Sequence, residues 1–217
     1  MLVLAIDTAG VNCSAALYDG ASGRLLSSVT ETIGKGHAER LMAIVDQALD
    51  DAGLPLKSVQ RIAVGIGPGS FTGIRVGVAA ARGLALALNV ECVGVTTLET
   101  LAAAHLAKHP GRPVVAVMDA KRDEVYAQAF SAEGSPLSEP TALSPDDAAA
   151  LIAQLSADVT GSWRPHEAPV LPDHFDIAVI AKLAAAKPKG SQKPKPLYLR
   201  GPDAKPQTGF ALARQIS

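Results

Sequence analysis

The chain has 217 residues, which is enough for one large domain or two small lobes with a sizeable buried core. Its 20 basic and 21 acidic residues give a net charge of −1, which excludes both a polycation that coats nucleic acid and an acidic disordered protein. Two cysteines, Cys13 and Cys92, are too few for a disulfide scaffold or a zinc site built from thiolates.

The first elements expected along the chain are three consecutive strands. Residues 2–6 form a short apolar run typical of a buried strand, without the basic segment or cleavage site of a signal peptide. A second strand is expected over 14–18, and the Asp-Gly and Ser-Gly pairs that follow it lead into a third strand over 25–32. Three strands joined by tight turns predict an antiparallel meander, not the strand-helix start of a dinucleotide-binding domain.

Helices and strands then alternate as far as residue 109. The expected elements are a helix over 37–52 ended by Gly53, a strand over 61–66, a helix over 70–88, a strand over 92–95 and a helix over 97–109. This order predicts a first lobe over 1–109, with a five-stranded mixed sheet between helices. The most membrane-like stretch, 76–90, is about fifteen residues long and carries Arg82, so it is expected not to span a bilayer. We therefore expect a soluble, cytoplasmic α/β protein.

A second, smaller set of elements begins after the Pro-Gly-Arg-Pro segment at 110–113. It comprises strands over 114–118 and 124–130, a strand near Thr141, a helix over 146–155, a strand over 157–160 and a helix over about 177–186. Residues 110–186 are therefore predicted to form a reduced second lobe that repeats the first in shortened form. Residues 187–217 are rich in proline and lysine at their start and predict an extended tail.

The densest signal for a functional site is the segment GIGPGSFTGIRVG at 65–77, between a strand and a long helix. Its glycines let the backbone turn sharply, and Ser70 is a candidate N-cap whose helix start could face a phosphate. The segment lacks the Gly-Lys-Ser/Thr of a Walker loop and the spacing of the dinucleotide fingerprint. A phosphate cradle and a plain strand-to-helix turn both remain open.

Small residues recur every four positions along the helix that follows. Gly73, Gly77 and Ala81 form a stripe without side chains, although an interior glycine costs about 1 kcal/mol relative to alanine. The stripe predicts a close backbone contact, either with the chain's own sheet or with a neighbouring subunit. Arg75 and Arg82 on the same helix exclude a membrane-spanning dimer motif.

Few other residues have the spacing of a catalytic or metal site. Asp7 and Asp119 each end the first strand of a lobe, where a carboxylate could hold a metal-bound phosphate or simply start a turn. His105 and His109 have helical spacing, but no acidic partner lies between them to favour a zinc site. No Gly-x-Ser-x-Gly elbow supports a serine hydrolase.

The start of the tail carries a run of cations without an acid until Asp203. They are Lys187, Lys189, Lys193, Lys195 and Arg200. The run is either a solvated linker or an arm that contacts RNA phosphates. Its apolar segment PLYLR, at 196–200, predicts that this part docks on the protein.

Four segments resemble the TsaB (YeaZ) family: IDTA at 6–9, GIGPGSFTGIRVGVAAARGLA at 65–85, DAKRDEVYA at 119–127 and PLYLR at 196–200. The resemblance covers nearly the whole chain. It implies an α/β fold with two related lobes of the actin-like ATPase (ribonuclease H-like) type, each a mixed sheet flanked by helices. It also implies a non-catalytic subunit of the complex that forms N6-threonylcarbamoyladenosine at position 37 of tRNAs reading ANN codons.

The resemblance also implies partners and an interface. The partners are a TsaD-like transferase and a TsaE-like ATPase, with tRNA bound through the complex and a homodimer considered for the isolated chain; no membrane is involved. In the family, the first two helices of the first lobe pack against the partner. The interface residues implied here are Leu41, Met42, Val45, Leu49, Gly73, Gly77 and Ala81.

Departures from the catalytic paralogue sharpen this prediction. That transferase has a His-x-x-x-His metal pair where this chain has Thr97 and Leu101, which cannot replace two imidazoles. The second-lobe phosphate loop, rich in glycine in ATPases of this fold, is DAKR at 119–122. We therefore expect no metal site and no transfer or efficient ATP hydrolysis by this chain alone.

The cofactor expectations follow from the same comparison. Asp7 and Thr8 are predicted to be a degenerate phosphate site, no cofactor is expected to bind the isolated chain tightly, and ATP or ADP is expected only at a subunit junction. Two other function classes remain. One is a stand-alone sugar or acetate kinase with Asp7 as its metal-water ligand; the other is a metallopeptidase-like protein, against which the absent histidine pair argues.

Overall fold

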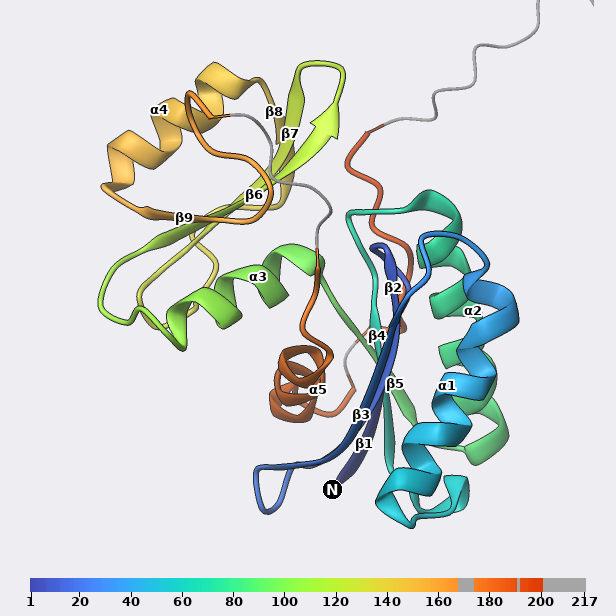
Figure 1. Cartoon of the computed structure of the whole chain (residues 1–217). Coiled ribbons are helices and arrows are strands. Elements are labelled where there is room, and N and C mark those ends of the chain that lie inside the picture. Colours follow the sequence, from blue (N-terminus) through green and yellow to red (C-terminus); the bar gives the residue numbers. More distant parts are fainter. Residues whose placement is uncertain (168–173, 191, 201–217) are drawn as a thin grey trace, which may run out of the picture.

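The computed structural model describes residues 1–167, 174–190 and 192–200, which form two lobes built around separate mixed sheets (Figure 1). The strands of the first sheet are β1 (Leu2–Asp7), β2 (Asn12–Asp19), β3 (Arg24–Thr32), β4 (Arg61–Gly65) and β5 (Glu91–Val95). Their order is β3-β2-β1-β4-β5, with antiparallel pairs on one side of β1 and parallel pairs on the other. The predicted meander and five-stranded mixed sheet are confirmed.

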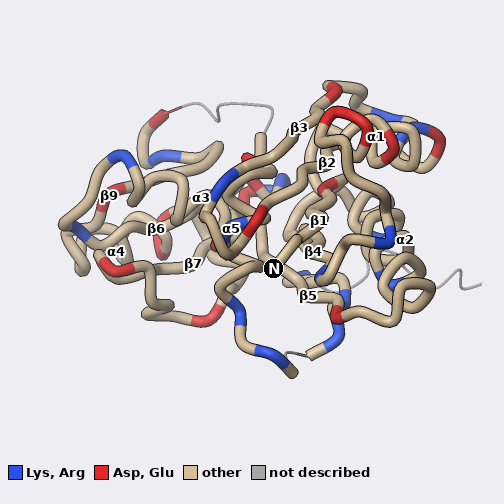
Figure 2. Tube along the Cα trace, turned by 90° about the horizontal axis from the view of Figure 1, so that it is seen from below, with Lys and Arg blue, Asp and Glu red and all other residues tan. Residues whose placement is uncertain are grey.

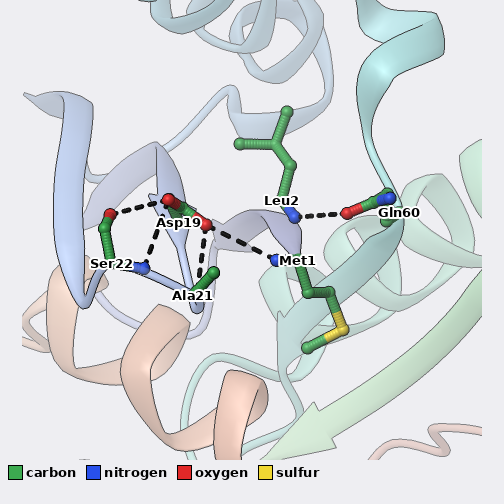
Figure 3. Close-up of polar contacts among 6 residues, drawn as sticks. All are labelled: Met1, Leu2, Asp19, Ala21, Ser22 and Gln60. Carbon is green, nitrogen blue, oxygen red and sulfur yellow. Dashed lines mark hydrogen bonds and ion pairs between the residues drawn. The ribbon is translucent and has the colours of Figure 1, made fainter.

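Polar contacts fix the start of the chain at one end of this sheet (Figure 3). Asp19 accepts hydrogen bonds from the Ser22 hydroxyl at 2.6 Å and from the Met1 amino group at 3.4 Å. Gln60 accepts a hydrogen bond from the backbone N–H of Leu2 at 2.9 Å. The bond from Ser22, with those from neighbouring N–H groups, lowers the pKa of Asp19 to about 2. The turn predicted from Asp-Gly is therefore held by a carboxylate that stays ionised.

Helices cover both faces of the first sheet (Figure 1). Helices α1 (His37–Ala52) and α2 (Phe71–Leu88) lie on one face, and α5 (Ile177–Ala186) lies on the other. A short 3-10 turn, η1 (Leu56–Ser58), connects α1 to β4. The central strand β1 is therefore enclosed on both faces, and its apolar run is buried.

The second sheet is smaller. Its strands are β6 (Val114–Lys121), β7 (Glu124–Phe130), β8 (Thr141–Leu143) and β9 (Asp158–Thr160), in the order β8-β7-β6-β9. Helix α4 (Pro145–Leu155), capped by Ser144, packs on one face, and α3 (Thr97–Leu106) packs on the other. Alternate residues of β6 therefore face two different clusters of apolar side chains.

Two helices lie on the lobe opposite to the one predicted from their place in the sequence. Helix α3 falls in the predicted first lobe, 1–109, but packs against β6, β7 and β9. Helix α5 falls in the predicted second lobe, 110–186, but Ile180, Ala181 and Ala184 are fully buried in the core of the first sheet. With α3 and α4 already covering the second sheet, the apolar side of α5 fills the remaining face of the first sheet. Each sheet is thus completed by a helix from the other half of the chain.

Helix α2 agrees with the predicted helix over 70–88 to within one residue, with Ser70 as its N-cap. Among the described residues, it is the one helix long and apolar enough to cross a membrane by length and composition alone. It nevertheless packs on β4 as a core helix of the first lobe. Only 33% of its eighteen residues are buried, so much of its apolar surface points away from the sheet.

Candidate functional site

The glycine-rich segment is folded tightly against the end of β1. A Cβ atom on Gly65 would lie 2.0 Å from the carboxylate oxygen Oδ1 of Asp7, and one on Gly73 would lie 2.0 Å from the Thr8 carbonyl oxygen. A Cβ atom on Gly77 would lie 2.5 Å from the Thr8 hydroxyl oxygen. These distances leave no room for any side chain at the three positions. The three glycines therefore allow the glycine-rich segment to lie directly against the end of β1.

Hydrogen bonds within the protein occupy the polar groups of this segment. The Thr8 hydroxyl donates to the Gly73 carbonyl at 2.7 Å, and the Ser70 hydroxyl accepts from the Gly73 N–H at 3.2 Å. The Ser70 N–H donates to the Ala9 carbonyl at 2.7 Å. Since these N–H groups point at protein oxygens, the geometry favours a strand-to-helix turn over a phosphate cradle.

The glycine stripe does not face a partner. Gly73, Gly77 and Ala81 are buried, and they lie against the end of β1 and against β4. Of the two alternatives, the structure therefore favours a contact within the chain over one with a neighbouring subunit for these three residues. The physical reason is that the small residues are required where α2 crosses its own sheet at short range.

Most of the predicted interface on α1 is also internal. Leu41, Val45 and Leu49 belong to the core of the first lobe and are at most 6% exposed. Met42 is 44% exposed and is the one member of the predicted set that reaches the surface. Helical periodicity identified the apolar face of α1, but that face is needed to cover the chain's own sheet.

Asp7 is buried at the end of β1, behind the glycine-rich segment. Burial raises the pKa of its carboxyl group to about 7, against the lowering effect of hydrogen bonds from the N–H groups of Ala9 and Thr8. Thr8 is fully buried as well. A carboxyl group that is partly protonated at neutral pH and enclosed by backbone is a poor ligand for a metal-bound phosphate.

The positions compared with the transferase histidines have structural contacts. The Thr97 hydroxyl donates to the Pro68 carbonyl at 2.7 Å, and the Thr97 N–H donates to the Gly67 carbonyl at 2.9 Å. Leu101 packs against the core. Across residues 1–167, 174–190 and 192–200, no three His, Cys, Asp or Glu side chains are grouped to hold a metal ion.

The predicted residues of the second lobe have partners that the sequence did not reveal. His105 lies 3.2 Å from Asp158, whose pKa is lowered mainly by this contact and also by Arg112. Asp119 pairs with Lys121. Burial opposes ionisation of Asp119, but its bonds with Lys121 lower its pKa below the usual range. Asp119 is thus engaged within the β6–β7 hairpin.

A cleft of about 940 Å³ lies between the start of α2, the β6–β7 hairpin and residues 197–200. The residues that give the cleft its chemical character are Phe71, Arg75, Lys121, Arg122, Tyr198 and Arg200. Asp7 and Thr8 are not among its described lining residues. The cleft is therefore distinct from the predicted phosphate site at Asp7 and Thr8, although part of the 65–77 segment lines it.

The tail reaches this cleft, which confirms that the PLYLR segment docks. The Leu197 N–H donates to the Ile66 carbonyl at 2.8 Å. The Tyr198 ring centroid lies 5.1 Å from that of Phe71, and the Tyr198 hydroxyl accepts a hydrogen bond from Arg75 at 2.8 Å. Arg200 forms an ion pair with Glu124 of β7. The tail thus connects the first lobe to the second across the mouth of the cleft.

The cations of the tail do not form one continuous arm. Lys187 pairs with Glu99 at 3.2 Å, and Lys189 and Lys193 line a separate cavity of about 920 Å³ beside the C-terminal part of α2. Arg200 lies in the cleft between the lobes. Residues 201–217 of the predicted tail lie outside the described residues.

Phe71, Arg75 and Tyr198 lie in segments that the sequence analysis quoted, but the sequence did not identify them as residues of a functional site. The spacing of Phe71 and Arg75 places them on one side of a helix and was a usable signal. The arrival of Tyr198, 123 positions after Arg75, depends on the tertiary fold and carries no local signal.

Comparisons with known proteins support one family. A family model described as "TsaD: tRNA N6-adenosine threonylcarbamoyltransferase" matches residues 26–159. The chain is 38% identical over 126 residues to the tRNA threonylcarbamoyladenosine biosynthesis protein TsaB of Escherichia coli, covering 58% of this chain and 53% of that protein. It is also 30% identical over 220 residues to an uncharacterized protein of Mycobacterium tuberculosis, covering 94% of each. The chain thus spans about half the length of the first TsaB relatives it matches.

Solved structures give a consistent result over more of the chain. YeaZ from Pseudomonas aeruginosa matches with a TM-score of 0.70 and 32% identity, over 84% of this chain and 90% of that chain. A second Pseudomonas aeruginosa structure, described as an uncharacterized protein with similarity to peptidase YEAZ, matches with a TM-score of 0.76 and 32% identity. That match covers 92% of this chain and 99% of the other.

Proposed function

The chain belongs to the TsaB/YeaZ family, and from this premise we propose that it is a supporting, non-catalytic subunit in the formation of N6-threonylcarbamoyladenosine in tRNA. The proposed target is position 37 of tRNAs that read ANN codons. Its proposed partners are a TsaD-like transferase and a TsaE-like ATPase, and tRNA binds through the complex. The TsaB relatives are named tRNA threonylcarbamoyladenosine biosynthesis proteins, which supports a role in this modification pathway.

The observation that carries a supporting role is the outer face of α2, on the side away from the sheet (Figure 1). Two thirds of this apolar helix are not buried, although its mean hydropathy is 1.4. We define the outer face by the exposed residues Ala79, Gly83, Leu86 and Ala87, with the partly buried Val76 and Ala80 at its edge. Leu86 is 84% exposed, and no other atom approaches the position of a Cβ on Gly83. An apolar helix face of this kind is typical of a surface that a protein partner covers.

The interior contacts support the absence of catalysis by this chain. Thr97 is fully buried, and its hydrogen bond to Pro68 holds α3 against the glycine-rich segment. The position compared with a metal-binding histidine therefore serves packing between elements. Asp7, which a stand-alone kinase would use, lies behind that segment and has a raised pKa. We propose that no cofactor is held tightly by the isolated chain and that ATP or ADP binds only at a subunit junction.

The proposal is tested by co-purification with the TsaD-like protein of the same organism. Ala79→Arg places a long cation in the middle of the outer face and is expected to abolish co-elution without unfolding the chain. Ala150→Arg makes the same change at an exposed position of α4 and is expected to leave co-elution intact. In isolation the same face is proposed to pair two copies of the chain, so Ala79→Arg should also yield a monomer.

Reconstituted tRNA modification provides the second measurement. Supplied with an activated threonylcarbamoyl donor, the TsaD-like and TsaE-like proteins are expected to modify tRNA only when this chain is added. Ala150→Arg is expected to support this modification, whereas Ala79→Arg is not. Modification that proceeds equally well without the chain would overturn the proposed function. Normal co-elution of Ala79→Arg would place the interface elsewhere.

A further inference from the structure

The cleft between the lobes combines aromatic rings with basic side chains. Four of its described lining residues are cations, namely Arg75, Lys121, Arg122 and Arg200, and none is acidic. Elsewhere, acidic and basic residues are dispersed over both lobes (Figure 2). Lys121 and Arg200 pair with Asp119 and Glu124 beside the cleft. Arg75 contacts two aromatic rings and, among the described residues, no carboxylate, so its charge favours a ligand that carries negative charge.

The aromatic part of the cleft is exposed and pre-arranged. Phe71 is 53% exposed and Tyr198 is 43% exposed, in a chain with only 4% aromatic residues. The Arg75 guanidinium lies 3.7 Å from the centroid of the Phe71 ring and donates to the Tyr198 hydroxyl. Arg75 therefore covers part of the Phe71 ring and holds both rings at a fixed position, and about half of each aromatic side chain remains exposed.

Aromatic faces next to cations are the elements that proteins use to bind single-stranded nucleic acid. Bases stack on the rings, and the cations follow the phosphates. We propose that this cleft binds a short single-stranded segment of RNA, with bases on Phe71 and Tyr198 and phosphates near Arg75 and the β6–β7 hairpin. This inference rests on the proposed function, which supplies an RNA substrate, and adds to it a contact surface on this chain.

The contacts around the cleft favour an RNA strand over a free nucleoside triphosphate. The N–H groups of Ser70 and Gly73, at the start of α2, already point at oxygens of the protein. No metal-binding group of side chains is present in the described part of the chain, and Asp7 does not line the cleft. Phosphates must therefore be contacted by side chains spread along the cleft, which suits an extended backbone.

Fluorescence anisotropy of the full chain with a labelled ten-nucleotide oligoadenylate RNA tests the proposal. Phe71→Leu removes a stacking ring, and Arg75→Gln removes the charge that joins the two rings. Each is expected to weaken binding about ten-fold at low salt, in line with the loss of one stacking or phosphate contact. Arg82→Gln makes the same change seven residues further along α2, beside the other cavity, and is expected to change binding less than about two-fold.

Further measurements make the result decisive. Arg75→Gln should also reduce the slope of log affinity against log salt by about 1, whereas Phe71→Leu should leave this slope unchanged. Tyr198→Phe keeps the ring and should bind more tightly than Phe71→Leu. Circular dichroism and thermal melting confirm that each variant is folded, which is expected because both rings are half-exposed.

Three outcomes would overturn the assignment. They are no binding by the parent chain, equal losses in Arg75→Gln and Arg82→Gln, and displacement of the labelled RNA by magnesium-ATP at lower concentrations than unlabelled RNA of the same sequence requires. Co-purification separates this proposal from the proposed function. If a complex containing Arg75→Gln assembles and modifies tRNA normally, the proposed function holds, but the cleft does not contribute to it.

Discussion

The inner and outer faces of α2 carry glycines that look alike in the sequence but lie in different surroundings. On the inner face, a Cβ on Gly77 would lie 2.5 Å from the Thr8 hydroxyl oxygen. On the outer face, no atom of the described residues, beyond the adjoining residues and backbone of α2 itself, lies within 4 Å of a Cβ on Gly83. The inner glycine is required by the chain's own packing, whereas the outer one leaves a flat apolar surface. A stripe of small residues therefore does not by itself identify an interface.

The largest effect that distinguishes the two faces is expected for Gly77→Leu. The added side chain would overlap Thr8 and Val64, so α2 would have to move away from β1 and β4. We expect a loss of about 3 kcal/mol in the free energy of unfolding, at the upper end of the usual cost of overpacking. Urea denaturation followed by circular dichroism measures this loss. A variant as stable as the parent would mean that the inner face is not in contact with the sheet.

A pH-dependent change in the free energy of unfolding, similar in size to the effect of Gly77→Leu, is expected from Asp7. Its side chain lies against the inner side of the glycine-rich segment. Its carboxyl group ordinarily ionises near pH 3.8, but burial raises its pKa to about 7 in the folded chain. The folded state therefore keeps a proton that the unfolded chain loses, and stability should fall as the pH rises from about 4 to about 7. Asp7→Asn removes this dependence and should be more stable than the parent at pH 8 by something on the order of 3 kcal/mol.

The comparison that tests this prediction is urea denaturation of both proteins at pH 4.5 and pH 8. The two stabilities should be close at the lower pH and separate at the higher one. Parallel pH profiles for Asp7→Asn and the parent would show that the Asp7 carboxyl group does not titrate with a raised pKa.

A smaller effect is expected from the hydrogen bond that joins the inner face to β1. Thr8→Val keeps the shape of the side chain but removes the hydroxyl that donates to the Gly73 carbonyl at 2.7 Å. Because this bond is buried, we expect a loss of about 1–2 kcal/mol in the free energy of unfolding. Thr72→Val, at an exposed position in the first turn of α2, is the matched control and should cost much less. Equal losses would show that the effect comes from exchanging a hydroxyl for a methyl group in general and not from the buried hydrogen bond.

Local patterns predicted most of the elements, because turns and helical periodicity depend on neighbouring residues. The meander follows from the turn at Asp19, and the predicted helix over 37–52 has the bounds of α1. The packing of α3 and α5 on opposite lobes could not be predicted, because it depends on which sheet face is left uncovered.

The candidate site was harder to predict for the same reason. Asp7 and Thr8 were identifiable as the end of a strand, but not as residues enclosed by the glycine-rich segment. Phe71 and Tyr198 meet only because the tail returns along the first lobe to the cleft. Periodicity alone also could not show that Leu41 faces the interior while its neighbour Met42 faces the surface of the fold.

The smallest change in stability, and of opposite sign, is expected for Gly83→Leu on the outer face. Leucine has a higher helix propensity than glycine, and its side chain would extend into open space. The free energy of unfolding should therefore rise by up to about 1 kcal/mol. If the outer face is the partner surface, the same side chain should hold the partner helix away and weaken co-purification with the TsaD-like protein. Gly77→Leu and Gly83→Leu thus introduce the same side chain at positions six residues apart. Gly77→Leu is expected to impair folding, and Gly83→Leu is expected to impair assembly with the partner. Unfolding of both variants would show that the two faces are equally packed within the chain.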